Sequence, residues 1–138
     1  MSKKYYLDTS IRLDLFEERD EPGLPKSILA ERLITKIIAE EGAIIYSMAV
    51  LDELSAIGYP RQELNLMFRP FRRILTFAEC NKNTFGKAKD LAAKRDVPLF
   101  DAIHALIARE NRTVLVTRDA HFNKLKDIVI VKKPEEIS

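Results

Sequence analysis

The chain has 138 residues, 46% of them hydrophobic, which is enough for one domain with a single core and too little for two ordinary domains. We therefore interpret residues 1–138 as one domain. The 23 basic and 21 acidic residues nearly cancel to a formal net charge of +2, so the overall charge alone does not identify the kind of partner. The apolar runs are shorter than the roughly 18 residues that span a bilayer, and no leader-like segment opens the chain, so we expect a cytoplasmic protein with no membrane partner.

Cysteine usage limits the chemistry of any metal site. The chain has one cysteine, Cys80, which excludes an internal disulfide and a cysteine-based metal cage. Ligands to a metal would then come from oxygen atoms or from the two histidines, which favours Mg²⁺ or Mn²⁺.

Short β-rich runs alternate along the chain with longer helical patterns, which is typical of an α/β domain with a mainly parallel sheet. The five predicted strands are Lys4–Leu7, Ala43–Tyr46, Ile74–Phe77, Thr113–Thr117 and Ile128–Val131. The pattern therefore predicts a central five-stranded sheet.

Helical patterns occupy the intervals between these strands. The first is Ser27–Glu41, which carries an apolar stripe of helical period. A helix that carries Glu53 follows the second strand. Two more helices, one beginning near Asn81 or Thr84 and one around Leu99–Glu110, precede the fourth strand.

Four carboxylates fall where such a sheet places its ligand site. In an open parallel sheet, ligands bind beyond the carboxyl ends of the strands. Asp8 ends the first apolar run, Asp119 follows the fourth, Glu53 sits on the helix after the second strand, and Asp101 lies in the first turn of its helix. We expect these four side chains to converge on one edge of the sheet.

Helix geometry separates Glu53 from its acidic neighbour Asp52. With residues placed at intervals of about 100°, Val50, Leu54 and Ile57 form the buried stripe of this helix. Glu53 borders that stripe, whereas Asp52 lies near the opposite face. We therefore expect Glu53 to lean inward and Asp52 to face water.

Each carboxylate also has a plainer interpretation, because Asp at the end of a strand is often a turn former or a helix cap. The set is more informative than its members. Four carboxylates at one edge would repel one another strongly unless a cation lay among them, so the cluster indicates a divalent metal.

Four segments carry a resemblance to a known family. They are Tyr6-Leu7-Asp8-Thr9-Ser10, Leu51-Asp52-Glu53-Leu54, Asp101-Ala102-Ile103-His104-Ala105-Leu106 and Val116-Thr117-Arg118-Asp119-Ala120-His121-Phe122. In this order they resemble the four motifs of PIN-domain nucleases, and they look most like the VapC-type toxins of VapBC toxin–antitoxin pairs. The resemblance spans nearly the whole chain.

The resemblance implies a three-layer α/β/α PIN-like fold and an endoribonuclease that depends on Mg²⁺ or Mn²⁺. It assigns metal binding and catalysis to the same four carboxylates. Thr117 matches the supporting threonine of the family, and Thr9 and Ser10 match the small polar pair after the first Asp. The family often has an acidic or polar residue at the position of His121, so the chain departs from the family motif at this position. The resemblance also implies an RNA substrate, a homodimer and a VapB-like antitoxin partner.

We expect Asp8 and Asp119 to be direct metal ligands, with Glu53 or Asp101 accepting a proton from the attacking water. Products would then carry 5′-phosphate and 3′-hydroxyl ends. His104 lies three residues after Asp101, and His121 lies two after Asp119, so both are close enough to support the carboxylates. Such histidines are more often packed or surface groups, and we assign a role to neither.

A basic stretch is a candidate for gripping RNA phosphates. Arg69, Arg72 and Arg73 follow Arg61 within thirteen residues, and nearby Phe68 and Phe71 offer stacking surfaces for bases. The alternative interpretation is a solvated helix face with its aromatic rings in the core or at a dimer contact.

Other functions stay open at this point. An aspartate-based phosphatase would place an Asp where this chain has Ser10, and a phosphate-receiver domain would need an acidic pair at the first strand. A PIN-like RNA-processing nuclease that is not a toxin, and a binding module without catalysis, are further alternatives.

Overall fold

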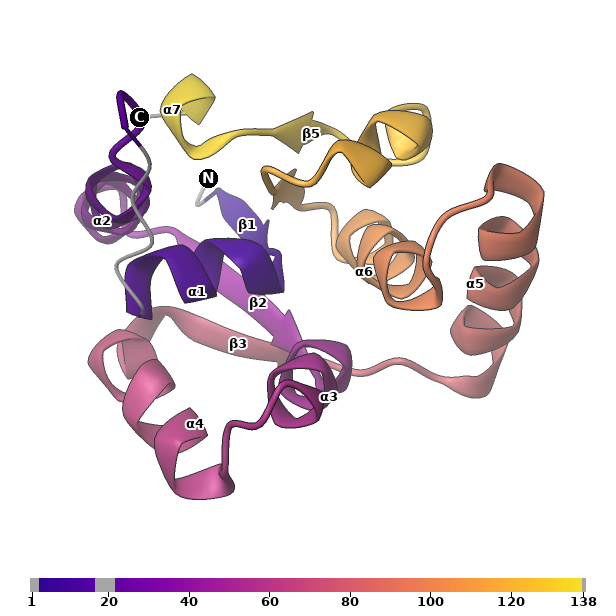
Figure 1. Ribbon diagram of the computed structural model, residues 1–138, viewed down its shortest axis with the longest axis horizontal. Helices are drawn as coiled ribbons and strands as arrows, with labels where there is room; N and C mark the ends of the chain where they lie inside the picture. Colours follow the sequence, from indigo (N-terminus) through magenta and orange to yellow (C-terminus); the bar gives the residue numbers. More distant parts are fainter. Residues whose placement is uncertain (1–2, 17–21, 138) are drawn as a thin grey trace.

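The computed structural model describes residues 3–16 and 22–137, which form a parallel sheet enclosed by helices (Figure 1). The strands are β1 (Lys4–Leu7), β2 (Ala43–Ser47), β3 (Leu75–Ala78), β4 (Val114–Val116) and β5 (Val131–Lys132). They lie in the order β3-β2-β1-β4-β5, and every neighbouring pair is parallel. The predicted α/β class with a five-stranded sheet is thus confirmed.

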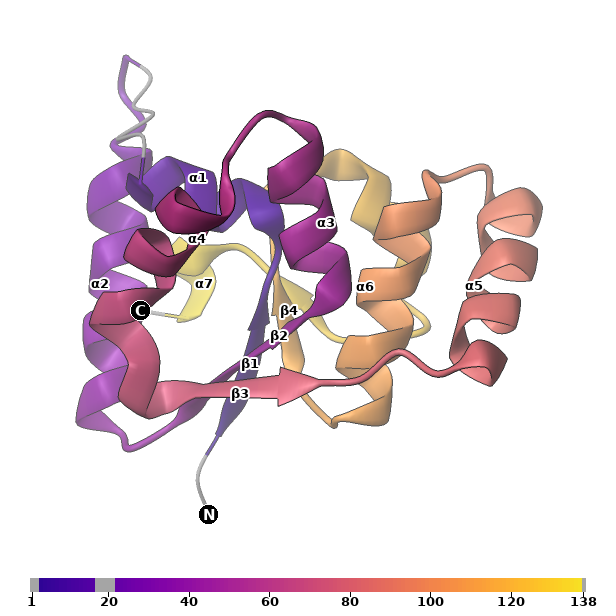
Figure 2. The same cartoon turned by 90° about the horizontal axis from the view of Figure 1, so that it is seen from below.

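Helices cover both faces of the sheet. They are α1 (Thr9–Phe16), α2 (Lys26–Ala39), α3 (Met48–Ala56), α4 (Arg61–Phe68), α5 (Lys82–Arg95), α6 (Leu99–Glu110) and α7 (Pro134–Ile137), with the 3₁₀ helices η1 (Arg69–Ile74) and η2 (Ala120–Leu125). Figure 2 shows α1 and α2 on one side of the strands and α3 and α6 on the other, with α5 packed outside α6. This is the three-layer arrangement.

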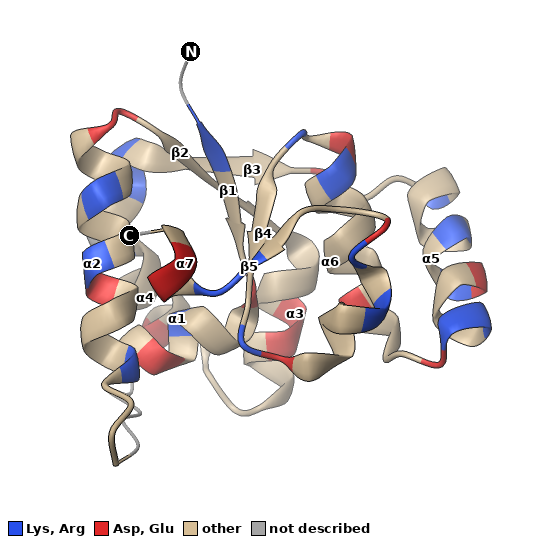
Figure 3. Cartoon of the chain, turned by 90° about the horizontal axis from the view of Figure 1, so that it is seen from above, with Lys and Arg blue, Asp and Glu red and all other residues tan. Residues whose placement is uncertain are grey.

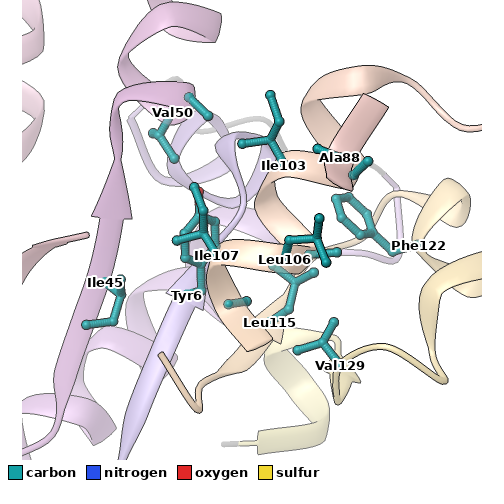
Figure 4. Close-up of a cluster of buried hydrophobic side chains, with 14 of the residues drawn as sticks. Tyr6, Ile45, Val50, Ala88, Ile103, Leu106, Ile107, Leu115, Phe122 and Val129 are labelled. Carbon is teal, nitrogen blue, oxygen red and sulfur yellow. The ribbon is translucent and has the colours of Figure 1, made fainter. Parts of the chain in front are cut away.

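Alternation along β1 builds a core on each face. Tyr5 and Leu7 pack with buried residues of α1 and α2, whereas Tyr6 packs on the opposite face against α3 and α6. Figure 4 shows Tyr6 in this second cluster, near Ile107 and Leu115. The cluster around Tyr6 holds α3 and α6 against the sheet, and these two helices carry Glu53 and Asp101.

Several local predictions differ from the structure, and three of the differences have a clear physical reason. The fifth strand is Val131–Lys132 instead of Ile128–Val131, because turns after η2, including the hydrogen bond from Ile128 N to Leu125 O, delay its start. The third strand begins at Leu75, since Ile74 still belongs to η1. Ile57 is 57% exposed because α3 ends at Ala56, one residue before it.

Helices α1 and α4 have no counterpart among the predicted elements. The buried face of α1 includes Arg12 and Asp14, so its hydrophobic periodicity is interrupted by charged residues. Within residues 3–16 and 22–137, none of the helices combines the length and the hydropathy that crossing a membrane requires.

Candidate active site

The candidate site lies where the strand order reverses direction. β1 has β2 on one side and β4 on the other, and Asp8 follows β1 directly. Asp119 comes shortly after β4, so both side chains lie beyond the carboxyl ends of adjacent strands. This is the topological switch point at which open α/β sheets bind their ligands.

Asp8 is fixed by three hydrogen bonds to its carboxylate. Its Oδ1 accepts from the backbone amide of Thr9 at 2.8 Å, and its Oδ2 accepts from Ser10 Oγ at 2.8 Å and from Thr117 Oγ1 at 2.9 Å. Its backbone amide also donates to Val116 O of β4 at 3.0 Å. The Asp8 carboxylate is therefore held in one orientation, and only 5% of the residue is exposed.

Thr117 joins the two strand ends. Its hydroxyl donates to Asp8 and accepts from the backbone amide of Asp119 at 3.0 Å. Asp119 Oδ1 in turn accepts from the backbone amide of His121 at 2.9 Å. One buried hydroxyl thereby links the Asp8 carboxylate to the backbone of Asp119, although the two residues are far apart in sequence.

Glu53 reaches the site from α3. Its Oε1 accepts from Thr9 Oγ1 at 3.0 Å and makes a short hydrogen bond with Nε2 of His104 on α6. Asp52, its neighbour, is exposed, as the helical periodicity predicts. Figure 3 shows the acidic segment of α3 and the one after β4 toward the same end of the sheet.

Asp101 is the least favourably placed of the four carboxylates. The residue is 6% exposed, and its Oδ2 is buried without a hydrogen-bond partner, although His121 Nδ1 lies 3.3 Å away. Burial, together with the nearby charges of Asp119 and Asp8, raises the pKa of Asp101 to about 6.

The acidic and imidazole groups form two sets of three. One is Asp8, Glu53 and His104, and the other is Asp101, Asp119 and His121. Within each set, one potential ligand atom from each residue lies within 4.8 Å of the others.

These donors fit a divalent cation of the Mg²⁺ or Mn²⁺ type, because carboxylate oxygens dominate and one exposed imidazole is available. Oδ2 of Asp101, which is buried without a hydrogen-bond partner, supports the same conclusion. A buried carboxylate oxygen without a hydrogen-bond donor is costly, and a cation would satisfy it.

The predicted arginines lie elsewhere on the molecule. Arg69, Arg72 and Arg73 belong to η1, which precedes β3, whereas the carboxylates lie beyond the carboxyl ends of strands. All three are exposed. Phe68 is half-buried, with its ring 5.4 Å from that of Tyr46 and under the guanidinium of Arg12.

One central group of the site, His104, was not predicted from the sequence. Its position one helical turn after Asp101 was the available signal, but its contacts come from residues distant in the chain. Tyr6 of β1 and Glu53 of α3 bond its two ring nitrogens. His121, also left without a role, lies 3.2 Å from Asp119 Oδ1 as well as near Asp101.

Comparison with known proteins identifies the family. The sequence model of the PIN domain matches residues 5–128. The chain belongs to the PIN domain family. No curated protein sequence matches this PIN domain.

Solved structures share the fold at low sequence identity. One is VapBC2 from Rickettsia felis bound to a DNA fragment from their promoter, with a TM-score of 0.67 and 16% identity over 94% of this chain and 98% of that one. Another is VapBC-1 from nontypeable Haemophilus influenzae, with a TM-score of 0.65 and 19% identity over 96% and 98% of the two chains. A third is FitAcB from Neisseria gonorrhoeae, with a TM-score of 0.59 and 17% identity over 95% and 98%.

Proposed function

We propose that this PIN domain is an endoribonuclease that depends on Mg²⁺ or Mn²⁺ and hydrolyses RNA phosphodiester bonds. The observation that carries the proposal is the convergence of four carboxylates from four separate segments, one of them with a buried oxygen that lacks a hydrogen-bond donor. Membership of the PIN family, whose members are typically metal-dependent nucleases, supports it.

Asp8, Asp119, Asp101 and Glu53 would hold the cation. Bound there, a divalent cation supplies positive charge that neutralises the phosphate and lowers the pKa of the attacking water. Asp8 and Asp119 are the primary ligands in this proposal. Glu53 or Asp101 accepts the proton of the attacking water, and the products carry 5′-phosphate and 3′-hydroxyl ends.

Thr9, Ser10 and Thr117 have a supporting role in this proposal. They donate to Asp8 or Glu53, and these bonds fix the carboxylates before the cation binds. The bond from Ser10 to Asp8 also weighs against an aspartate-based phosphatase, because Ser10 stands where such enzymes place a second Asp and uses its hydroxyl to orient the first one.

We further propose that the chain is the cytoplasmic toxin of a toxin–antitoxin pair, acting as a homodimer and inhibited by a VapB-like antitoxin protein. The support is structural: VapBC and FitAB proteins, and a toxin–antitoxin complex from Klebsiella pneumoniae, share its fold. Co-expression with a small DNA-binding protein encoded beside it should relieve growth arrest. Cleavage without growth arrest would favour an RNA-processing nuclease.

Arg69, Arg72 and Arg73 are proposed to contact the RNA backbone away from the carboxylates. Removing one contact between an arginine and a phosphate lowers the slope of log affinity against log salt concentration by roughly one unit in magnitude. Arg69→Ala and Arg72→Ala should therefore flatten the dependence of RNA affinity on salt. Unchanged slopes would remove these arginines from the RNA-binding surface.

The deciding experiment is cleavage of a mixed single-stranded RNA pool with Mg²⁺, Mn²⁺ or chelator. Asp8→Asn and Asp119→Asn should each lower cleavage by about 100-fold or more, because each removes a negative ligand with little change in shape. Asp52→Asn is the matched control and should cleave like the wild type. A wild-type protein that binds Mn²⁺ but cuts no RNA would instead support a binding module, and 2′,3′-cyclic phosphate products would contradict the proposed water attack.

A further inference from the structure

A chain of buried hydrogen bonds runs from the sheet into the candidate site. Ser47 Oγ lies 2.7 Å from the hydroxyl of Tyr6, and this hydroxyl lies 2.6 Å from Nδ1 of His104. Nε2 of His104 then bonds Oε1 of Glu53. Ser47, Tyr6 and His104 are each 0% exposed, so water does not compete for these bonds.

For an ionised Glu53 and a neutral imidazole, the chemistry of the groups sets the direction of each bond. An ionised Glu53 only accepts, so Nε2 of His104 carries the proton and donates. In the neutral imidazole Nδ1 is then an acceptor, which requires Tyr6 to donate to it. The Tyr6 oxygen accepts from Ser47 in turn.

These bonds involve only one of the two carboxylate oxygens of Glu53. Oε1 accepts from both His104 and Thr9. Among residues 3–16 and 22–137 the structure gives no hydrogen bond to Oε2. About a quarter of the Glu53 side chain (26%) is exposed, so the carboxylate is accessible to a cation or water. The oxygen left free is thus selected by the protein.

The same bonds argue against His104 as a metal ligand, although it lies 3.9 Å from Asp8 and forms a set of three with Asp8 and Glu53. A neutral imidazole has one lone pair for a cation, and here it is on Nδ1. Tyr6 occupies that lone pair. His104 therefore acts through Glu53 and not on the cation itself.

We propose that His104 is the positioning residue of Glu53, and that Tyr6 and Ser47 fix its Nε2-protonated tautomer so that Oε2 of Glu53 faces the cation or water. This inference rests on the proposed nuclease function and deepens it. Hydrogen-bond partners of this kind typically change metal affinity or activity by about 10–100-fold when removed.

The tautomer is measurable without any activity assay. The chain has two histidines, so ¹⁵N spectra of histidine-labelled protein contain only two imidazole systems. We expect His104 to show a protonated Nε2 and an unprotonated Nδ1 at neutral pH, and Tyr6→Phe to shift the Nδ1 resonance because its donor is lost. A wild-type His104 protonated on Nδ1 would overturn the proposal.

Two substitutions of His104 separate positioning from packing. In His104→Gln the side-chain amide can still donate to Glu53, whereas His104→Leu removes the donor. We expect His104→Leu to weaken Mn²⁺ binding, followed by electron paramagnetic resonance, and to lower kcat about tenfold or more with KM for RNA unchanged. His104→Gln should recover most of both losses.

Controls keep the inference distinct from the proposed function. Asp52→Asn should behave like the wild type, and Glu53→Gln gives the effect of losing the carboxylate itself. Thermal unfolding identifies variants that fail to fold, in which case Tyr6→Phe replaces His104→Leu in the Mn²⁺ assay.

If Glu53→Gln impairs Mn²⁺ binding and cleavage but His104→Leu does not, the positioning role of His104 is wrong while the nuclease proposal stands. If the wild type cuts no RNA, the nuclease proposal fails and the ¹⁵N and Mn²⁺ results still decide the role of His104.

Discussion

Asp101 is held in a position that opposes its own ionisation. It is buried, one of its oxygens has no hydrogen-bond partner, and Asp119 and Asp8 lie close by. Its location in the first turn of α6 favours a negative charge, but this effect is modest beside the burial. The protein therefore keeps a strained carboxylate where a cation would relieve it.

This position makes the stability of the cation-free protein depend on pH. The pKa of Asp101 is about 6 in the folded protein against 3.8 for the free group, so between these values the folded state binds more protons than the unfolded state. In chelator, the free energy of unfolding should therefore fall as pH rises from 4 to 7. Asp101→Asn should remove that fall and be more stable at pH 7 by about 1–2 kcal/mol. Urea unfolding at several pH values measures this, and equal pH slopes in both proteins would contradict it.

His121 brings a nitrogen atom to the otherwise oxygen-rich set of Asp101 and Asp119. Imidazole favours Mn²⁺ over Mg²⁺, because Mg²⁺ prefers oxygen ligands. His121→Ala should therefore weaken Mn²⁺ binding about tenfold and leave Mg²⁺ binding nearly unchanged. Calorimetric titration with each cation tests this, with exposed Asn123→Ala as control. Equal losses for both cations would contradict the preference for Mn²⁺, and unchanged Mn²⁺ binding would exclude His121 as a ligand.

The residues of the site differ in how far the sequence predicts them. Asp8, Asp119 and Thr117 are predictable because strand ends and parallel pairing place them at one edge. His104 is not, because its role depends on Tyr6 and Glu53, which are 98 and 51 residues away in sequence. Sequence periodicity identifies the face on which a histidine lies but not the groups that tertiary packing brings to its two nitrogens.

At the scale of elements, predictions succeeded where apolar periodicity was uninterrupted. The helix α6 has the predicted bounds Leu99–Glu110, and its residues 101–108 are all buried. In α1, Arg12 and Asp14 occupy buried positions, so the pattern resembles a polar segment. Because buried charged groups interrupt the hydrophobic periodicity of α1, this helix cannot be predicted from periodicity alone.

The start of α5 offers a test of local structure that is independent of the site. Asn81 caps the helix, its side-chain oxygen accepting from the backbone amide of Thr84 at 2.8 Å. Asn81→Ala should lower the free energy of unfolding by about 1 kcal/mol, because that amide loses its acceptor. RNA cleavage should be unchanged, since α5 packs on the outer side of α6. Asn83→Ala, in the same exposed first turn, is the control, and an equal loss in both variants would argue against capping.

For the molecule as a whole, the strand order is what creates the site. Because β4 pairs with β1, Thr117 bonds Asp8 across 109 residues of sequence, and helices α3 and α6 add Glu53 and Asp101 from opposite halves of the chain. The fold thus brings like charges together from segments that separate on unfolding. Such an arrangement lowers the stability of the cation-free protein and makes the folded state a far better cation ligand than the unfolded chain.

A cation should therefore act as a cross-link between distant parts of the sequence. At roughly 100 times its dissociation constant, a ligand that binds only the folded state adds about 2.7 kcal/mol to the free energy of unfolding. We expect Mn²⁺ to raise the midpoint of thermal unfolding of the wild type and of Asp52→Asn by similar amounts, because Asp52 is exposed. In Asp8→Asn the rise should be much smaller, since one ligand loses its charge. Scanning calorimetry with and without Mn²⁺ measures the three proteins side by side, and an undiminished rise in Asp8→Asn would place the bound cation outside this site.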